Sequence, residues 1–141
     1  MNREEIVSLV ARCQEAFDRH DADLIAAEHS EGCVMDSPTA GGRVIGRAPI
    51  AKVYDLWFQG FPDLVVTQED LLIDGERFSQ SYTLTGTDTG GFLGLPATGK
   101  PFRVPMVWLC EVGSGKIVRS RPIYDFSSVL IQIGLLKAKP A

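Results

Sequence analysis

The segment of residues 64–87, LVVTQEDLLIDGERFSQSYTLTGT, decides the fold class of this chain. Its middle is Asp74-Gly75, and an Asp-Gly pair between two strand-like runs is a strong signal of a β-hairpin. In the second run, residues 76–87, apolar side chains alternate with hydroxyl side chains, which is the two-residue period of a strand. The segment therefore predicts an antiparallel hairpin within a sheet.

Further strands follow this hairpin, and helices precede it. Residues 102–112 and 116–126 are typical of two long apolar strands, and a glycine-rich loop over residues 88–100 comes before them. Apolar residues at helical spacing predict a helix over about residues 3–19 and another that starts after Gly46. The other expected elements are a short helix from Asp21 to roughly His29, a short strand over residues 33–36, a turn at residues 39–42 and a terminal helical turn over residues 129–136.

Helices first and antiparallel strands afterwards indicate an α+β fold with the helices on one face of the sheet. The strands over residues 102–112 and 116–126 are apolar on both faces, whereas a free antiparallel sheet normally has one polar face. A second copy of the chain would cover the remaining apolar face. We therefore expect a homodimer.

The composition restricts the classes of function. The chain has 141 residues with 45% hydrophobic and 23% charged side chains, and we expect one domain over residues 1–141. The net charge of −4 argues against a nucleic-acid partner, and the polar start of the chain offers no membrane span. Three widely spaced cysteines, Cys13, Cys33 and Cys110, favour neither a disulfide framework nor a zinc site, so we expect the cytoplasm.

Several motifs together resemble one family. They are Gly46-Arg47 followed by Ile50, the run Phe61-Pro62-Asp63-Leu64, the loop Thr85-Gly86-Thr87-Asp88-Thr89-Gly90 with the glycines after it, and the turn Gly115-Lys116-Ile117-Val118. The chain resembles the SnoaL-like polyketide cyclases of the nuclear transport factor 2-like superfamily over about residues 5–136. The resemblance implies a cone-shaped, curved antiparallel sheet packed on three N-terminal helices, with an internal cavity, usually a dimer, and no metal or cofactor.

The resemblance also implies cofactor-free acid/base chemistry, such as cyclisation or isomerisation of a ring-shaped ketone. In the family, the base is a carboxylate on the last strand, in a stretch that corresponds here to Arg119-Ser120-Arg121-Pro122. Pro122 takes the position of that carboxylate and cannot accept a proton. A family histidine on the preceding strand corresponds to Trp108. A noncatalytic binding module is therefore the alternative to an enzyme.

Two aspartates remain as candidate general bases. Asp125 is either a base displaced to the end of the cavity or a residue that anchors the chain by capping or by pairing with an arginine. Asp36 is either a base with a pKa raised by desolvation or a cap for the turn at Ser37-Pro38. Strand alternation predicts that Asp36 and Ser37 point in opposite directions.

The candidate substrate-binding residues are aromatic or soft side chains that suit a flat apolar ligand. They are Tyr54, Trp57, Tyr82, Met106, Trp108 and Tyr124, with a tyrosine hydroxyl as hydrogen-bond donor. Arg121 either clamps a polar group of the ligand or pairs with a neighbouring carboxylate. An epoxide hydrolase would need an Asp–Arg–Asp group, of which Arg121 and Asp125 supply a part.

The apolar residues of the glycine-rich loop, Phe92, Leu93 and Leu95, form either a lid over the cavity or a loop packed on itself. The two histidines, His20 and His29, suggest no metal site.

Overall fold

The structure, a computed structural model, describes residues 1–138. This part of the chain contains four α-helices, six strands and two 3-10 turns. The elements are α1 (Arg3–Asp18), α2 (Ala22–Ala27), β1 (His29–Ser37), η1 (Pro38–Ala40), β2 (Gly42–Ile45), α3 (Arg47–Gly60), β3 (Val65–Asp74), β4 (Arg77–Thr87), η2 (Phe92–Gly94), β5 (Pro101–Gly113), β6 (Lys116–Tyr124) and α4 (Phe126–Gln132).

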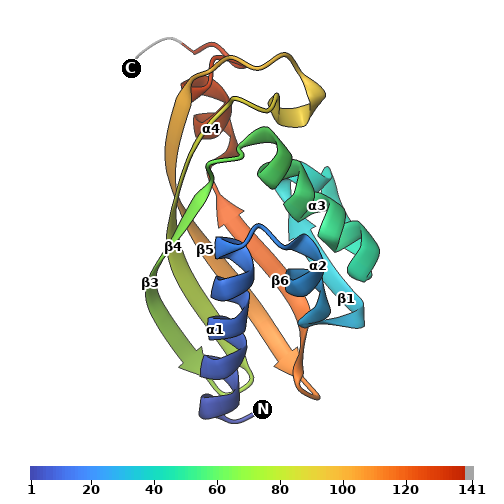
Figure 1. The fold of residues 1–141 in the computed structure, drawn as a ribbon. Coiled ribbons are helices and arrows are strands. Elements are labelled where there is room, and N and C mark those ends of the chain that lie inside the picture. The colour runs from blue at the N-terminus through green and yellow to red at the C-terminus, as the bar shows by residue number, and fades with distance from the viewer. Residues whose placement is uncertain (139–141) are drawn as a thin grey trace.

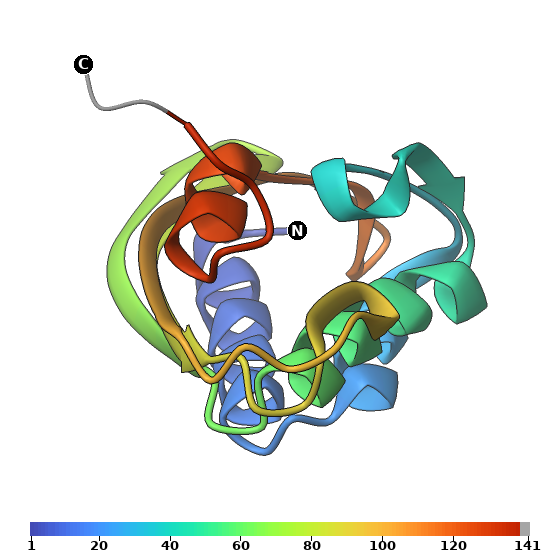
Figure 2. The same ribbon diagram turned by 90° about the horizontal axis from the view of Figure 1, so that it is seen from above.

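The six strands form one curved sheet that does not close, in the order β2-β1-β6-β5-β4-β3. All neighbouring pairs are antiparallel except β1 and β6, which run parallel. Figures 1 and 2 show the sheet curving around α1, with α2 and α3 on the same side of it. The predicted α+β class is therefore confirmed.

The hairpin predicted at Asp74-Gly75 joins β3 to β4, and Asp74 and Arg77 are partners at its closed end. The first predicted helix is also present as α1. Asn2 caps it, because its side chain accepts a hydrogen bond from the Glu5 amide and the Glu5 side chain accepts one from the Asn2 amide. Such a cap stabilises a helix by about 1 kcal/mol.

Two local predictions were wrong. The second helix ends at Ala27, and His29 starts β1 instead of ending that helix. The cause is tertiary, because the Ile117 amide donates to the Glu28 carbonyl and His29 pairs with Ile117 in the sheet. The segment predicted as a turn at residues 39–42 continues into an edge strand, β2, which pairs with β1 over only four residues and has a weak sequence signal.

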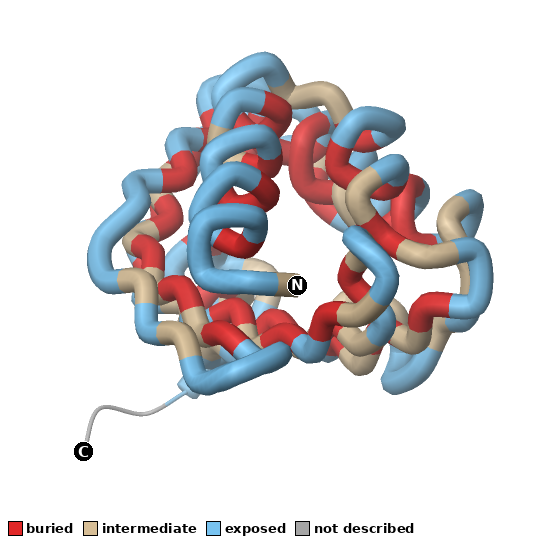
Figure 3. Tube along the Cα trace, turned by 90° about the horizontal axis from the view of Figure 1, so that it is seen from below, coloured by how far each residue is buried: buried red, intermediate tan, exposed pale blue. Residues whose placement is uncertain are grey.

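The core lies between the helices and the concave face of the sheet, as the inward-facing buried residues in Figure 3 show. The glycine-rich loop closes one end of this core. Asp88 holds the loop by accepting hydrogen bonds from the backbone amides of Phe92 and Thr98. Phe92 is buried against Trp57 and Phe61, at ring-centroid distances of 4.9 and 4.6 Å, so the loop is firmly docked.

Candidate functional site

An apolar cavity lies between α1, α3 and the concave face of the sheet. Side chains from β1, β3, β4, β5 and β6 also contribute to its wall. The lining residues are Phe17, Met35, Ser37, Val53, Tyr54, Trp57, Phe58, Leu64, Val66, Leu84, Met106, Pro122 and Tyr124. The cavity volume is only about 50 Å³. A cavity that holds benzene needs about 150 Å³, so a ring-shaped ligand would require side chains to move.

The lining of this cavity is almost entirely apolar. None of its thirteen residues is an aspartate, glutamate, histidine, lysine or arginine. The polar side chains among the lining residues are those of Ser37, Tyr54, Trp57 and Tyr124. An uncharged hydroxyl or indole is a poor general base near neutral pH.

One polar cluster lies at the η1 side of the cavity and centres on the hydroxyl of Thr39. Tyr124 donates to Thr39 Oγ1 over 3.2 Å and Trp57 Nε1 donates to it over 3.3 Å. The hydroxyl of Ser37 lies 3.1 Å from the same atom. Burial raises the pKa of Tyr124, so its phenol keeps its proton and acts as a donor. We call these four residues the Thr39 cluster.

A second polar cluster lies deeper in the core. Trp108 Nε1 donates to Ser120 Oγ over 2.8 Å, and the Tyr54 hydroxyl also lies beside Ser120. The hydroxyl of Tyr82 is buried without a hydrogen-bond partner among the described residues. Burial raises the pKa values of Tyr54 and Tyr82, so both phenols are protonated.

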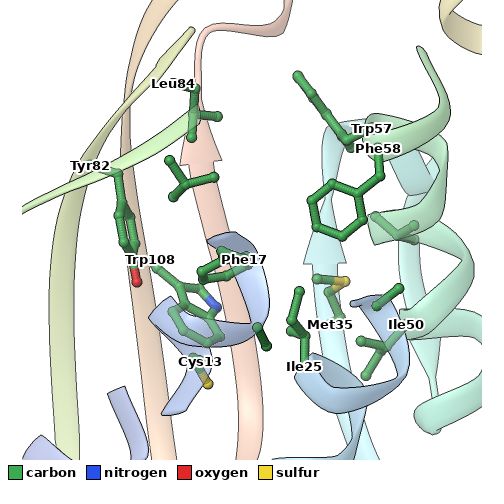
Figure 4. Close-up of a cluster of buried hydrophobic side chains, with 14 of the residues drawn as sticks. Cys13, Phe17, Ile25, Met35, Ile50, Trp57, Phe58, Tyr82, Leu84 and Trp108 are labelled. Carbon is green, nitrogen blue, oxygen red and sulfur yellow. The ribbon is translucent and has the colours of Figure 1, made fainter. Parts of the chain in front are cut away.

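The structure brings four of the predicted substrate-binding residues into the cavity wall, namely Tyr54, Trp57, Met106 and Tyr124. Tyr82 and Trp108 are not in the wall. They lie one layer further in, where the ring of Phe17 contacts both, with centroids 5.9 and 5.8 Å away (Figure 4). The hydroxyl of Tyr82 and the indole of Trp108 are therefore separated from the cavity by Phe17.

Arg121 and Asp36 lie on the convex face of the sheet, outside the cavity. Arg121 pairs in register with Leu109 and lines a shallow depression on that face. Asp36 forms an ion pair with Arg43, over 3.0 Å, and a longer one with Arg119, over 3.8 Å. The hydrogen bond from Arg43 is the main cause that lowers the pKa of Asp36. Ser37, the next residue, lines the cavity, as strand alternation predicts.

Asp125 also lies outside the cavity wall. It is exposed and caps α4, where its carboxylate accepts a hydrogen bond from the Ser128 amide over 2.9 Å. Pro122, in contrast, lies in the wall on β6, paired with Trp108 of β5. The position that resembles the family's catalytic carboxylate therefore faces the cavity with a side chain that cannot carry a proton.

Sequence reasoning missed several wall residues, including Phe17, Met35, Phe58 and Leu84. The apolar spacing of α1 does place Phe17 on the buried face of that helix, but it cannot separate a cavity wall from solid core. Within residues 1–138, no group of three histidines, cysteines, aspartates or glutamates could hold a metal ion. No helix among these residues is long and apolar enough to cross a membrane.

The chain is similar to known proteins over most of its length. The sequence pattern of the SnoaL-like polyketide cyclases matches residues 7–133. No curated protein matches the chain. The structure of AclR from Streptomyces galilaeus is 24% identical, with a TM-score of 0.83, and the match covers 99% of this chain and 91% of that one.

Two further solved structures are informative. A protein of Xanthomonas campestris pv. campestris, assigned to the polyketide cyclases, is 30% identical with a TM-score of 0.75, and the match covers 94% of this chain and 99% of that one. TerC, which was co-crystallised with polyporic acid, is 15% identical with a TM-score of 0.75, over 92% of this chain and 98% of that one.

Proposed function

The chain belongs to the SnoaL-like polyketide cyclase family, and from this premise we propose that it binds a small, uncharged, largely apolar ring-shaped molecule in the cavity between α1, α3 and the sheet. The observation that carries the proposal is a wall of thirteen residues that contains no charged side chain. Moving a charged ligand from water into such a wall would leave its charge unpaired, which is costly. An uncharged ligand avoids this cost.

The size of the cavity requires the wall to adapt. Met35 and Met106 are the most adaptable wall residues, because a thioether side chain has several rotatable bonds and tolerates irregular spaces. The aromatic rings of Phe17 and Phe58 also border the free space. TerC, with a related fold, was crystallised with polyporic acid, which supports a small organic ligand here. We expect ligand binding to widen the cavity.

The enzymatic alternative is cofactor-free cyclisation or isomerisation of a ring-shaped ketone, with Asp125 or Asp36 as the base. It would require either carboxylate to reach the cavity from its present ion pair or helix cap. Epoxide hydrolysis would in addition require Arg121 to turn in from the convex face. Binding without turnover is favoured, because Pro122 takes the wall position that a base would need. Turnover that is lost in an Asp125→Asn variant with intact ligand binding would instead establish the enzyme.

The binding proposal is tested with three probes of one shape, the hydrocarbon indane, the 2-aminoindane cation and the indane-2-carboxylate anion. Titration calorimetry should detect indane and give much weaker binding for both ions. A Val53→Phe variant fills the cavity and should abolish indane binding, whereas Val65→Phe, at an exposed position outside the wall, should not. Equal affinity for the three probes, or indane binding that survives Val53→Phe, would contradict the proposal.

We further propose that the convex face of the sheet binds a second copy of the chain. Val107 and Ile123 are register partners on β5 and β6, and the two residues are 39% and 50% exposed. Arg121 lies beside them, and Asp36 and Glu111 supply carboxylates nearby, so two copies could match opposite charges. An Ile123→Asp variant should lower the sedimentation coefficient at micromolar concentration. If the wild-type protein sediments only as a monomer at this concentration, the proposed dimer is contradicted.

The cytoplasm remains the expected compartment. Cys13, Cys33 and Cys110 are all buried free thiols, which suits a reducing environment. Burial raises the pKa of the Cys13 thiol to about 12 and that of Cys33 to about 11, so neither is a ready nucleophile. Cell fractionation with an antibody against the chain would test the compartment.

A further inference from the structure

The hydroxyl of Tyr82 is an unusual feature of the core. The residue is 1% exposed, and its oxygen has no hydrogen-bond partner among the described residues. Buried hydroxyls are nearly always paired, because leaving one unpaired in the core destabilises the folded state. We therefore look for a hydrogen-bond acceptor for this hydroxyl outside the protein core.

Several polar side chains from five elements lie in the same part of the core as Tyr82. The ionisable neighbours of Tyr82 are the thiols of Cys13 on α1 and Cys110 on β5. Tyr54 on α3 lies close to both thiols, to Tyr82 and to Ser120 on β6. Together with the indole N–H of Trp108, which donates to Ser120, these groups form what we call the inner cluster. The inner cluster is polar but carries no charge at neutral pH.

Phe17 separates the Tyr82 and Trp108 side chains of the inner cluster from the cavity, whereas Tyr54 itself lines the cavity. Its ring lines the cavity and lies 5.9 Å from the Tyr82 ring, 5.8 Å from the Trp108 ring and 5.8 Å from the Tyr54 ring. Figure 4 shows Phe17 beside Tyr82 and Trp108 and above Cys13. Met106, the register partner of Tyr82, already lines the cavity. The Tyr82 and Trp108 side chains therefore lie directly behind one aromatic ring of the wall.

We infer that rotation of the Phe17 side chain joins the cavity to the inner cluster, and that the Tyr82 hydroxyl then donates a hydrogen bond to an uncharged oxygen of the ligand. This inference rests on the proposed binding function and specifies its ligand as a ring compound with a carbonyl or ether oxygen. The rotation also provides the volume that a ring-shaped ligand needs beyond the present cavity, because the Phe17 ring moves out of the space that the ligand enters. Burial keeps the Tyr82 phenol protonated, so it is available as a donor.

The test compares 1-indanone with indane, two uncharged probes of nearly equal shape that differ by a carbonyl oxygen. Calorimetry on the wild-type protein should give about fivefold to tenfold tighter binding of 1-indanone, the size expected for one net hydrogen bond. Tyr82→Phe keeps the ring and should abolish this preference. Tyr124→Phe, which removes the hydroxyl of the Thr39 cluster, tests the other donor in the wall, and the matched control is Ser79→Ala, which removes a hydroxyl on the convex face of β4 and should keep the preference.

Each other result has a defined meaning. A preference that survives in Tyr82→Phe and disappears in Tyr124→Phe would place the oxygen at the Thr39 cluster and overturn the inference. Indane binding without any preference for 1-indanone would overturn the inference and leave the proposed function standing. If neither 1-indanone nor indane binds, both the inference and the proposed function are overturned. A Phe17→Leu variant has a smaller side chain between the cavity and Tyr82 and should bind both probes more tightly. Unchanged affinities would show that the Phe17 ring does not move and would overturn the inference.

Discussion

The phenolic hydroxyl of Tyr124 donates a hydrogen bond to Thr39 Oγ1, and this 3.2 Å contact joins the end of β6 to a turn 85 positions earlier in the chain. Trp57 donates to the same oxygen. A Thr39→Val variant keeps the shape of the side chain but leaves both donors without this acceptor. The free energy of unfolding in urea should fall by about 1–3 kcal/mol. Thr39→Ser keeps the hydroxyl and should lose much less, and equal losses in the two variants would contradict this account.

The pair of Trp108 and Ser120 provides a second test, in a fully buried setting. Ser120→Ala removes the acceptor of the indole N–H and should lower the free energy of unfolding by about 1–3 kcal/mol. In the double variant with Trp108→Phe, the N–H is absent, so the cost of removing the Ser120 hydroxyl should shrink. The measurement is a double-mutant cycle in urea. Strict additivity of the two single changes would show that the hydrogen bond contributes little.

His29 predicts how stability depends on pH. Its side chain is fully buried, its Nδ1–H donates to the Ile25 carbonyl, and burial lowers its pKa from 6.5 to about 4. Below pH 6.5 the unfolded chain therefore takes up a proton that the folded protein does not. The free energy of unfolding should fall as the pH drops from about 7 to about 4, by about 3 kcal/mol in all.

The control for this prediction is a His29→Asn variant, which keeps an N–H donor near the Ile25 carbonyl and does not titrate. Its stability should change much less between pH 7 and pH 4. Asp36 and Asp63, which have lowered pKa values, lose their stabilising charge only as the pH falls below their ordinary value of 3.8. A wild-type profile that is flat in this window, or identical in the variant, would show that His29 is protonated inside the folded protein.

Pro122 allows the effect of a carboxylate in the cavity to be measured. A Pro122→Asp variant places an ionisable group in a wall without positive charge, so desolvation should raise its folded-state pKa. The ionised form is then the costly one, and stability relative to the matched Pro122→Asn variant should fall as pH rises from 4 to 8. The expected difference at pH 8 is of the order of 3 kcal/mol. Parallel profiles for the two variants would show that position 122 is open to solvent.

The sequence could predict those elements whose signals are local. The Asp74-Gly75 hairpin, the apolar stripe of α1, and the alternation that separates Asp36 from Ser37 all depend on residues within a few positions of each other. These predictions were confirmed. The start of β1 at His29 was missed because it depends on pairing with Ile117, and backbone pairing with a distant strand overrides a weak helical preference.

The candidate site could be predicted only in part, because its geometry also depends on contacts between distant segments of the chain. Residue type suggested Tyr54, Trp57, Met106 and Tyr124 as wall residues, and all four line the cavity. Residue type could not show that Tyr82 and Trp108 lie behind the ring of Phe17, because this depends on how one face of α1 packs against the sheet.

The sequence by itself determined the central hairpin, the first long helix and the family, since each of these depends on residue identity and short-range periodicity. Only the tertiary structure decided the narrow width of the cavity, the meeting of Tyr124 with Thr39 and the unpaired hydroxyl of Tyr82. The physical reason is that close packing and buried hydrogen bonds join side chains from distant segments, whose distances become defined only when the whole chain folds.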